Sequence, residues 1–439
     1  MKTNRIKNSL RASFWDGFFC SIMNGLIADY VTPYALWLKA STQQIGYLTA
    51  ATSLVSSIVQ LKAPDITERV KSRKKMVVGF VYLQALMLLP MMLIPYLFPG
   101  DGVTALIVFV ALFNGFSALA TPAWSSLISE YVPTGMRGRY FGWRSRVMNV
   151  VTITFSFVSG AILFSLHGRQ QLAFGIILSV AFLSRVVSWF FLNRMYEPKY
   201  VVKHENYFSM YRFLARFRHS NYAKFVVFIA CFHFAVNFAA PFFSVFMLRD
   251  LKFNYLTYFF LNASVTVTSI ATINRWGRFA DKVGNLRIIR FTSFFIASLP
   301  ILWVLNRHPA FLLFAQVLSG FAWAGFNLCV SNFIYDAVTA GKRTRCIAYF
   351  NVFAGIATFL GAISGGCAVG FMPPLFGYKL LSLFLIAGTL RFLVAGFLLT
   401  KIKEVRKAEE ISSRDLFYSV LGFNPFIGAA QDVRGEKEQ

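Results

Sequence analysis

The feature that most constrains this chain is a series of long apolar runs. A hydrocarbon core of about 30 Å needs about 20 residues of α-helix to cross it. Twelve runs of that size occur, in the first half at roughly 13–38, 43–62, 76–97, 103–131, 141–166 and 171–193, and in the second at roughly 222–248, 255–275, 287–306, 310–335, 346–371 and 379–400. The sequence therefore predicts an all-α integral membrane protein with twelve transmembrane helices.

The composition agrees with burial in lipid. Hydrophobic residues make up 56% of the 439 residues and charged residues only 14%, whereas soluble proteins carry roughly 25% charge. The formal net charge of +26 could suggest nucleic acid, but the basic residues lie in short loops and tails between apolar runs, not on one face of a polar domain. We therefore expect a lipid bilayer around the chain and no nucleic-acid partner.

Lys and Arg are unevenly shared between alternate loops, which predicts an orientation in the membrane. One set of loops carries Arg69, Lys71, Arg73, Lys74, Lys75, Arg137, Arg139, Arg278, Lys282, Arg287, Lys342, Arg343 and Arg345. The other set carries little beyond Lys39, Arg169, Arg249, Lys252, Arg307 and Lys379. Because cytoplasmic loops are enriched in Lys and Arg, we expect a multi-pass protein of the cytoplasmic (inner) membrane with both termini in the cytoplasm.

Matching positions in the two halves indicate a duplicated six-helix unit. The pairs are Glu130 and Asp336, Arg137 and Arg343, Arg139 and Arg345, Arg185 and Arg391, and Asp29 and Asn237. The sequence thus predicts two pseudo-symmetric six-helix bundles. We divide the chain into an N-terminal half at 1–194, a central cytoplasmic connection with an amphipathic helix at 195–221, a C-terminal half at 222–402 and a cytoplasmic tail at 403–439.

Two loop motifs resemble those of the major facilitator superfamily of secondary transporters. Gly277–Arg287 is similar to that family's signature Gly-x-x-x-Asp-Arg/Lys-x-Gly-x-x-Arg, and Glu130-x6-Arg137 and Asp336-x6-Arg343 resemble its Glu-x6-Arg signature. The resemblance covers about 1–402 and implies a twelve-helix transporter. The stretch from Pro122 to Gly142 looks like a group of bacterial members without a settled substrate.

The chain also departs from the family pattern. The first-half loop has Pro64 and Lys71 where glycines are usual, and Glu68 in place of aspartate. The Gly-Pro-x-x-Gly-Gly signature of the family's antiporters is absent from 141–166. This absence makes a multidrug efflux antiporter the less favoured interpretation.

The charged loop residues are candidates for a cytoplasmic gate. Charge-assisted hydrogen bonds between helix ends would close that side of the protein when the cavity opens outward. The candidates are Glu68, Arg69, Glu130, Arg137 and Arg139 in the first half, and Asp281, Lys282, Asp336, Arg343 and Arg345 in the second. The alternative is solvated charges kept for topology, since exposed ion pairs contribute only about 0–1 kcal/mol.

Asp29 is the candidate for proton coupling. It lies about 15 Å from the outer end of its predicted helix, near the bilayer midplane, at about 1.5 Å per residue. Pro33 lacks the amide that would bond the Asp29 carbonyl, and Pro241 has the same effect on Asn237. A carboxylate at this depth could take up a proton on one side and release it on the other. The alternative is a structural pair with an arginine.

Polar residues at helical spacing are candidates for a substrate cavity, because polar stripes facing lipid are unfavourable. The candidates are Asn24, Asn114, Thr121, His233, Asn237, Asn262, Thr266, Trp323 and Asn327. For any single residue, helix packing is the alternative interpretation. For the set, we expect the cavity lining.

We therefore predict a secondary transporter of a small solute, coupled to protons and acting by alternating access as a monomer. A non-transporting member that senses a ligand or assists membrane-protein assembly is the alternative. An enzyme is disfavoured, because only His233 among the histidines lies in a predicted span and no HExxH or GxSxG motif occurs. The five cysteines lie in apolar runs without CxxC spacing, so we expect no metal site, no disulfide and no cofactor.

Overall fold

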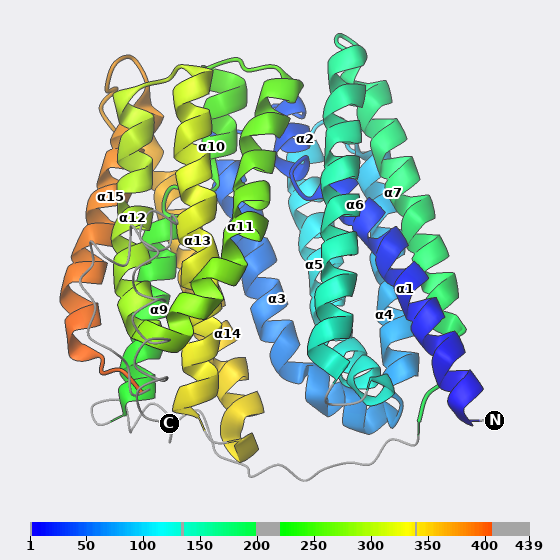
Figure 1. Cartoon of the computed structure of the whole chain (residues 1–439). Coiled ribbons are helices and arrows are strands. Elements are labelled where there is room, and N and C mark those ends of the chain that lie inside the picture. Colours follow the sequence, from blue (N-terminus) through cyan, green and yellow to red (C-terminus); the bar gives the residue numbers. More distant parts are fainter. Residues whose placement is uncertain (1, 133–135, 199–219, 339, 406–439) are drawn as a thin grey trace, which may run out of the picture. The chain divides into compact units, whose positions relative to one another are not determined.

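The computed structural model describes residues 2–132, 136–198, 220–338 and 340–405, and these ranges are almost wholly helical. Figure 1 shows α1 (Lys2–Ile27), α2 (Val31–Trp37), α3 (Thr42–Val70), α4 (Arg73–Leu97), α5 (Gly102–Tyr131), α6 (Arg137–Ser165), α7 (Gln170–Asn193), α9 (Asn221–Asn237), α10 (Phe242–Val245) with the π-helix η2 (Phe246–Asp250), α11 (Tyr255–Val283), α12 (Asn285–Leu305), α13 (Pro309–Ala337), α14 (Ala340–Ala368) and α15 (Lys379–Leu398). Each predicted apolar run coincides with a helix or with a pair of helices in sequence.

Ten helical segments of the described chain are long and apolar enough to cross a membrane. They are α4, α5, α6, α7, the segment from α9 to η2, α11, α12, α13, α14 and α15. Two segments fall outside this group. One is α1 together with α2, and the other is α3. A turn interrupts the first of these segments, and Ser, Thr and Gln residues lower the mean hydropathy of α3. The all-helical membrane architecture is thus confirmed, and the total of twelve spans stays a prediction.

The chain forms two compact units. The first contains Met1–Asn206, His233–Asn262 and Ala348–Phe384, and the second contains Tyr207–Phe232, Ala263–Ile347 and Leu385–Gln439. The boundaries cross α9, α11, α14 and α15. The division of the sequence into two halves around a central connection stays a prediction, and most of that connection (199–219) and of the tail (406–439) lies outside the described residues.

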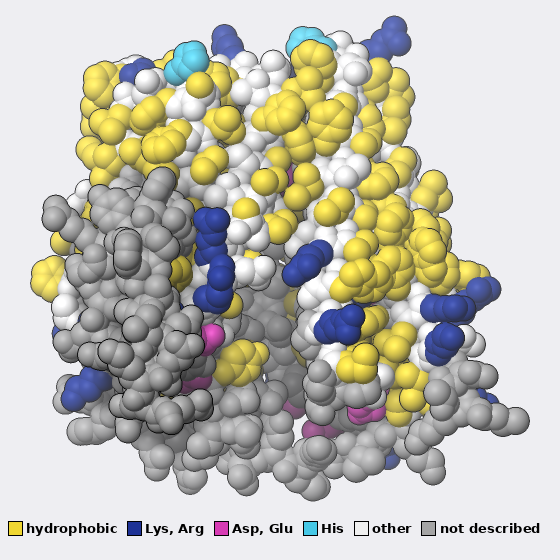
Figure 2. Space-filling model, viewed as in Figure 1, with side chains coloured by type: hydrophobic (Ala, Val, Ile, Leu, Met, Phe, Trp, Pro, Cys, Tyr) yellow, Lys and Arg dark blue, Asp and Glu magenta, His cyan; other side chains and the backbone are white. Residues whose placement is uncertain are grey.

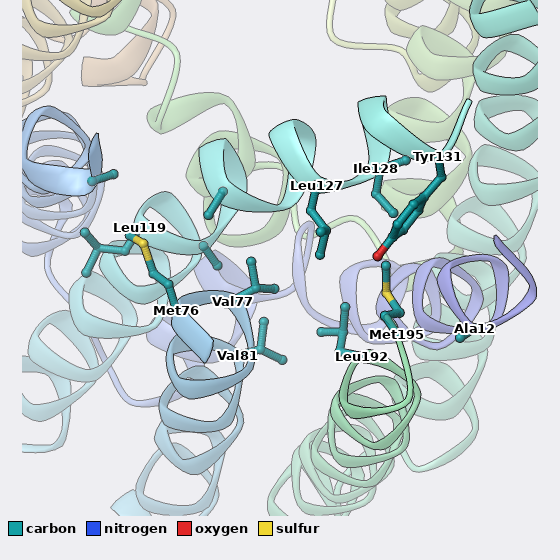
Figure 3. Packing of buried hydrophobic residues seen from close by; sticks show 13 residues of the cluster. Ala12, Met76, Val77, Val81, Leu119, Leu127, Ile128, Tyr131, Leu192 and Met195 are labelled. Carbon is teal, nitrogen blue, oxygen red and sulfur yellow. The ribbon is translucent and has the colours of Figure 1, made fainter. Parts of the chain in front are cut away.

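A cluster of buried apolar side chains holds α4, α5 and α7 together in the first unit (Figure 3). It includes Met76, Val77 and Val81 from α4, Leu119, Leu127 and Ile128 from α5, and Leu192 and Met195 at the end of α7. At the edge of the cluster, the Tyr131 hydroxyl donates to the Tyr196 carbonyl. This packing fixes the ends of α4, α5 and α7 beside one another, where charged residues gather.

The outer faces of α6 and α7 carry exposed hydrophobic side chains, among them Val150, Phe157, Leu183 and Phe190. Figure 2 shows hydrophobic side chains over much of the visible surface. Apolar patches of this extent are rare on monomeric soluble proteins. Such surfaces suit contact with lipid.

Candidate functional site

The first helix is broken at Asp29. Helix α1 ends at Ile27, residues 28–30 form a turn, and α2 begins at Val31. Pro33 has no amide hydrogen to offer the Asp29 carbonyl, so this oxygen has no partner within the helix. The Tyr258 hydroxyl, from α11, donates to it at 2.8 Å. The sequence predicted the freed carbonyl, and the structure supplies its donor.

The Asp29 carboxylate is bonded by a neutral group. The Ser156 hydroxyl, from α6, donates to Asp29 Oδ2 at 2.9 Å. The Tyr30 hydroxyl donates in turn to the Ser156 carbonyl at 2.7 Å. Among the described residues, the ion pairs do not include Asp29. A carboxylate held by a hydroxyl can gain or lose a proton without leaving an arginine unpaired.

Gly160 allows α6 to approach this turn closely. A Cβ atom built at Gly160 would lie 2.8 Å from the Tyr30 hydroxyl oxygen and 3.3 Å from the Phe259 Cβ atom. Those distances are too short for any larger residue without displacement of a neighbour. The glycine therefore keeps the α6 backbone against both the turn and α11.

The second copy of the motif is broken at the matching place. Helix α9 ends at Asn237, a turn covers 238–241, and α10 begins at Phe242. The Asn237 amide nitrogen donates to the His233 carbonyl at 2.9 Å and to the Thr358 hydroxyl of α14 at 3.2 Å. Both breaks therefore carry a polar side chain bonded to a hydroxyl of a neighbouring helix. Only the first break carries a carboxylate.

A cavity of about 430 Å³ lies beside the first break, in the first unit. Its polar lining comes from α1, α2, α3 and α5, namely Asn24, Thr32, Thr49, Thr52, Ser53, Ser56 and Asn114. Ile27, Val31, Leu48, Met91, Val110 and Phe113 contribute apolar surface. Two of the predicted cavity residues, Asn24 and Asn114, are thus brought together.

Sequence reasoning missed the contribution of α3 to this cavity. Thr49, Thr52, Ser53 and Ser56 are spaced i, i+3, i+4 and i+7, which places them on one helix face. This hydroxyl stripe is the signal that could have identified the wall. It was hidden because serine and threonine are common in membrane helices, where their hydroxyls bond the preceding turn.

The other predicted cavity residues lie outside this lining. Thr121 is exposed on α5 and bonds the Ser117 carbonyl, and the Asn262 amide bonds the Tyr258 carbonyl. In the second unit, Trp323 packs edge-on against Phe326. Thr266 on α11 and Asn327 on α13 are exposed in that unit.

At the other end of the first unit, Glu130 forms an ion pair with Arg73 at the start of α4. The guanidinium makes two hydrogen bonds to the carboxylate, at 2.5 and 3.0 Å. The Arg73 side chain is only 2% exposed. The Glu130 side chain is 43% exposed, so the pair is bidentate and buried on the arginine side only.

Glu197, just beyond α7, caps the same end of α4. Its carboxylate accepts from the Arg73 and Lys74 amides at 2.6 and 3.2 Å, and from the Ser72 hydroxyl at 2.5 Å. A carboxylate at a helix N-terminus satisfies unpaired amides and interacts favourably with the helix dipole. Glu197 therefore ties the end of α7 to the start of α4.

The second unit repeats this arrangement at α12. The Asn285 amide donates to Asp336 Oδ2 at 2.8 Å, and Glu404, just beyond α15, accepts from the Leu286 amide at 2.7 Å. Asn285 thus occupies the place of Arg73, and Glu404 that of Glu197. Both arrangements use two carboxylates, and they differ in the residue that meets them at the start of the helix, Arg73 on α4 and Asn285 on α12.

The structure describes the side chains of five of the remaining predicted gate residues. Glu68, Arg69, Arg139, Asp281 and Lys282 have exposed side chains. The side chains of Arg137, Arg343 and Arg345 lie outside the described residues. Sequence reasoning missed Arg73, Glu197 and Glu404 as paired groups. The two glutamates follow Arg185 and Arg391 at nearly the same distance, a repeat that could have revealed them.

A second carboxylate, Asp16, is buried in the first unit. It accepts from the Ser188 hydroxyl at 2.7 Å and from the Trp124 indole at 3.2 Å. The Arg185 guanidinium donates to the Ser188 hydroxyl and to Gln84, so Ser188 bridges this cation and the Asp16 carboxylate. In the second unit, Arg391 donates instead to the Ile296 carbonyl at 3.1 Å. These arginines join α7 to α4 and α15 to α12.

Comparison with known proteins identifies a family for this architecture. The family model of the Major Facilitator Superfamily matches residues 17–362 and 225–434. No curated protein sequence matches the chain.

Several solved structures are similar in fold. The nucleoside transporter NupG is 16% identical, with a TM-score of 0.68 and coverage of 91% of this chain and 100% of the other. A D-xylose–proton symporter is 14% identical, with a TM-score of 0.65 and coverage of 93% and 99%. An inward-facing bacterial homologue of the iron transporter ferroportin is 12% identical, with a TM-score of 0.64 and coverage of 89% and 98%. At these identities the likeness concerns the fold.

Proposed function

Because the chain belongs to the major facilitator superfamily, we propose that it is a secondary active transporter that moves a small solute across the cytoplasmic membrane by alternating access. Family membership assigns the chain to transporters rather than enzymes. In this proposal twelve spans form two six-helix halves, 1–194 and 222–402, which rock about a site near the midplane as a monomer. Both termini, the connection 195–221 and the tail 403–439 lie in the cytoplasm.

The observation that carries the proposal is the broken first helix at Asp29. Interrupted helices at membrane depth are tolerated where they are buried in protein or line a cavity, and transporters bind substrates and coupling ions at such breaks. Here the break holds a carboxylate with a neutral partner beside a cavity of about 430 Å³. Asp29 is therefore the proposed proton-coupling group of a symporter.

The proposed cytoplasmic gate keeps the residues predicted from the sequence, and two of them, Glu130 and Asp336, brace the starts of α4 and α12 within their own half. Arg73, Glu130 and Glu197 join α4, α5 and α7, and Asn285, Asp336 and Glu404 join α12, α13 and α15. In the proposed orientation these contacts lie on the cytoplasmic side, as expected from the basic loops. They would hold each half rigid while the halves move.

The coupling role is tested with Asp29→Asn in proteoliposomes. The solute is first identified by a gradient-driven uptake screen across sugars, amino acids, organic acids and cationic drugs. We expect the variant to lose accumulation driven by a pH gradient, because an amide cannot carry the proton, and to keep exchange of internal for external solute. Asp101→Asn, in an exposed loop, serves as the control and should accumulate normally.

Two outcomes would contradict parts of the proposal. Full gradient-driven accumulation by Asp29→Asn would remove Asp29 from the coupling mechanism. Saturable ligand binding by the wild type without any exchange would instead indicate a sensor or an assembly factor.

A further inference from the structure

We infer that the cavity beside the Asp29 turn takes a neutral solute with several hydroxyl groups, of the ring-compound class that includes monosaccharides and nucleosides. The inference rests on the proposed transport function and adds the chemical class of the substrate. It uses the size of the cavity, the charge of its wall and the direction of the hydrogen bonds that its side chains already make.

The cavity has the size of a small-molecule site. Its volume of about 430 Å³ lies toward the lower end of the range of roughly 300–1,000 Å³ that is typical of ligand pockets. It can therefore hold a single small ring compound.

The wall of the cavity is uncharged. Among the described residues that line it, none is Asp, Glu, Lys, Arg or His. Asp29 is next to the lining residue Ala28, but its carboxylate bonds Ser156 on α6, which is not part of the wall. A charged solute here would lose its hydration without gaining a counter-charge from the wall, which is strongly unfavourable. The wall therefore selects a neutral solute.

The polar side chains of the wall present hydrogen-bond acceptors. The hydroxyls of Thr52 and Ser53 already donate to the Leu48 and Gly355 carbonyls, at 2.8 and 3.1 Å. The Asn114 amide donates to the Val110 carbonyl at 2.9 Å. A hydroxyl that has donated its proton still offers oxygen lone pairs, and the Asn114 side chain keeps its carbonyl oxygen and a second N–H. These oxygens match a solute that donates several O–H groups.

The apolar part of the wall suits the rest of such a molecule. Ile27, Val31 and Phe113 line the same cavity as the hydroxyl stripe of α3. A sugar or nucleoside ring has C–H groups as well as hydroxyls, so it can use both kinds of surface. Pockets that combine an apolar lining with a few placed polar groups bind ligands of this kind.

The class is tested with three probes that share one ring. They are a radiolabelled aldohexose, its uronic acid and its 2-amino sugar, which are neutral, anionic and cationic, and a neutral nucleoside is added as a second ring type. We expect saturable uptake into proteoliposomes, and binding in detergent, for at least one neutral probe. We expect no uptake of the uronic acid and at least about tenfold weaker binding of the amino sugar, since tenfold corresponds to about 1.4 kcal/mol.

Variants of the wall connect the result to this cavity. Thr52→Val and Asn114→Leu each remove an acceptor while keeping the branching and the number of side-chain heavy atoms, and should raise the KM of the neutral probe about tenfold, in line with one lost hydrogen bond. Thr104→Val, at an exposed position of α5 outside the lining, is the matched control and should leave the KM unchanged. Asn114→Asp should shift the preference toward the amino sugar. Thermal melting of each variant checks that it is folded.

The possible failures are distinguishable. Uptake of the uronic acid or amino sugar in preference to the neutral probes would overturn the substrate class and leave the transport function standing. Binding of a neutral probe without uptake would keep the site and overturn the transport function. The absence of both binding and uptake for every neutral probe, or a KM unchanged by Thr52→Val and Asn114→Leu, would overturn the inference.

Discussion

A single backbone oxygen shows how residue chemistry shapes the proposed coupling site. Pro33 deprives the Asp29 carbonyl of its helical partner, and the Tyr258 hydroxyl replaces it at 2.8 Å. The same hydroxyl lies 3.1 Å from the Ser244 hydroxyl. Tyr258 therefore links the broken first helix to α10 and α11 through one side chain.

Replacement of Tyr258 by phenylalanine should lower stability measurably. The Asp29 carbonyl would lose its donor, and one intramolecular hydrogen bond contributes about 0.5–1.5 kcal/mol net. The expected result is a lower melting temperature in detergent. Tyr82→Phe is the control, because the Tyr82 ring is 46% exposed and its hydroxyl should matter little. Equal melting temperatures for the two variants would show that the bond to Asp29 adds no net stability.

The role of Pro33 could be predicted from the sequence, but the identity of the donor could not. Removal of an amide by proline is local and follows from covalent structure. Tyr258 reaches the carbonyl only through the packing of α11 and α6 around Gly160, which no local pattern encodes. The same reason explains why the sequence indicated Glu130 as a gate residue and missed its partner, Arg73.

At the scale of helices, the carboxylates that follow α7 and α15 organise the ends of their repeats. Glu197 and Glu404 bond the first amides of α4 and α12. Glu197 thus ties the segment after α7 to the start of α4, and Glu404 ties the segment after α15 to the start of α12. The bounds of the long helices were predictable from hydrophobic run length, whereas these terminal contacts depend on residues that lie outside the apolar runs.

Removal of the Glu197 cap should weaken the start of α4. In Glu197→Gln the amides of Arg73 and Lys74 lose a charged acceptor, and helix caps and dipole contacts contribute about 0.5–2 kcal/mol. We expect a lower melting temperature and faster hydrogen exchange at residues 73–76. Glu68→Gln, at an exposed position of α3, should leave both unchanged. If exchange at the start of α4 is the same in both variants, the cap has no stabilising role.

At the scale of the molecule, close contact between α3 and α14 in the first unit brings together segments that are distant in sequence. A Cβ atom built at Gly46 would lie 2.7 Å from the Ala362 carbonyl oxygen and 3.3 Å from the Gly366 Cα atom. Nearby, Cys367 is exposed, and its sulfur lies 3.5 Å from the Gln43 side-chain nitrogen. In the proposed mechanism this contact closes the end of the protein opposite the cytoplasmic gate.

A larger residue at Gly46 should therefore force this closure open. In Gly46→Leu the side chain meets backbone atoms that cannot rotate away, so the populations shift toward conformers in which α3 and α14 separate. We expect a membrane-impermeant maleimide to label Cys367 several-fold faster. Gly79→Leu is the matched control, because nothing lies within 4 Å of a Cβ atom there. Cys367→Ser provides the blank, and unchanged labelling of Gly46→Leu would argue against closure at this contact.

The family and the all-helical membrane architecture could be predicted because the loop motifs and the long apolar runs are local features of the sequence. The cavity wall could not be predicted in full. Asn24 and Asn114 stood out as amides in apolar surroundings, but the hydroxyls of α3 resemble ordinary membrane-helix residues until the neighbouring helices show which face they share. Long-range packing, rather than local propensity, decides which polar residues meet.

The bond from Tyr258 to the Asp29 turn also has a kinetic consequence. In the proposed division these two residues belong to opposite halves, so every cycle in which the halves rock apart must release that hydroxyl and later recapture it. The bond would then act as a brake on turnover as well as a support for the resting protein. A transporter of this kind would turn over more slowly and open less often without cargo, and this hydroxyl would be one of the contacts that set the rate of such opening.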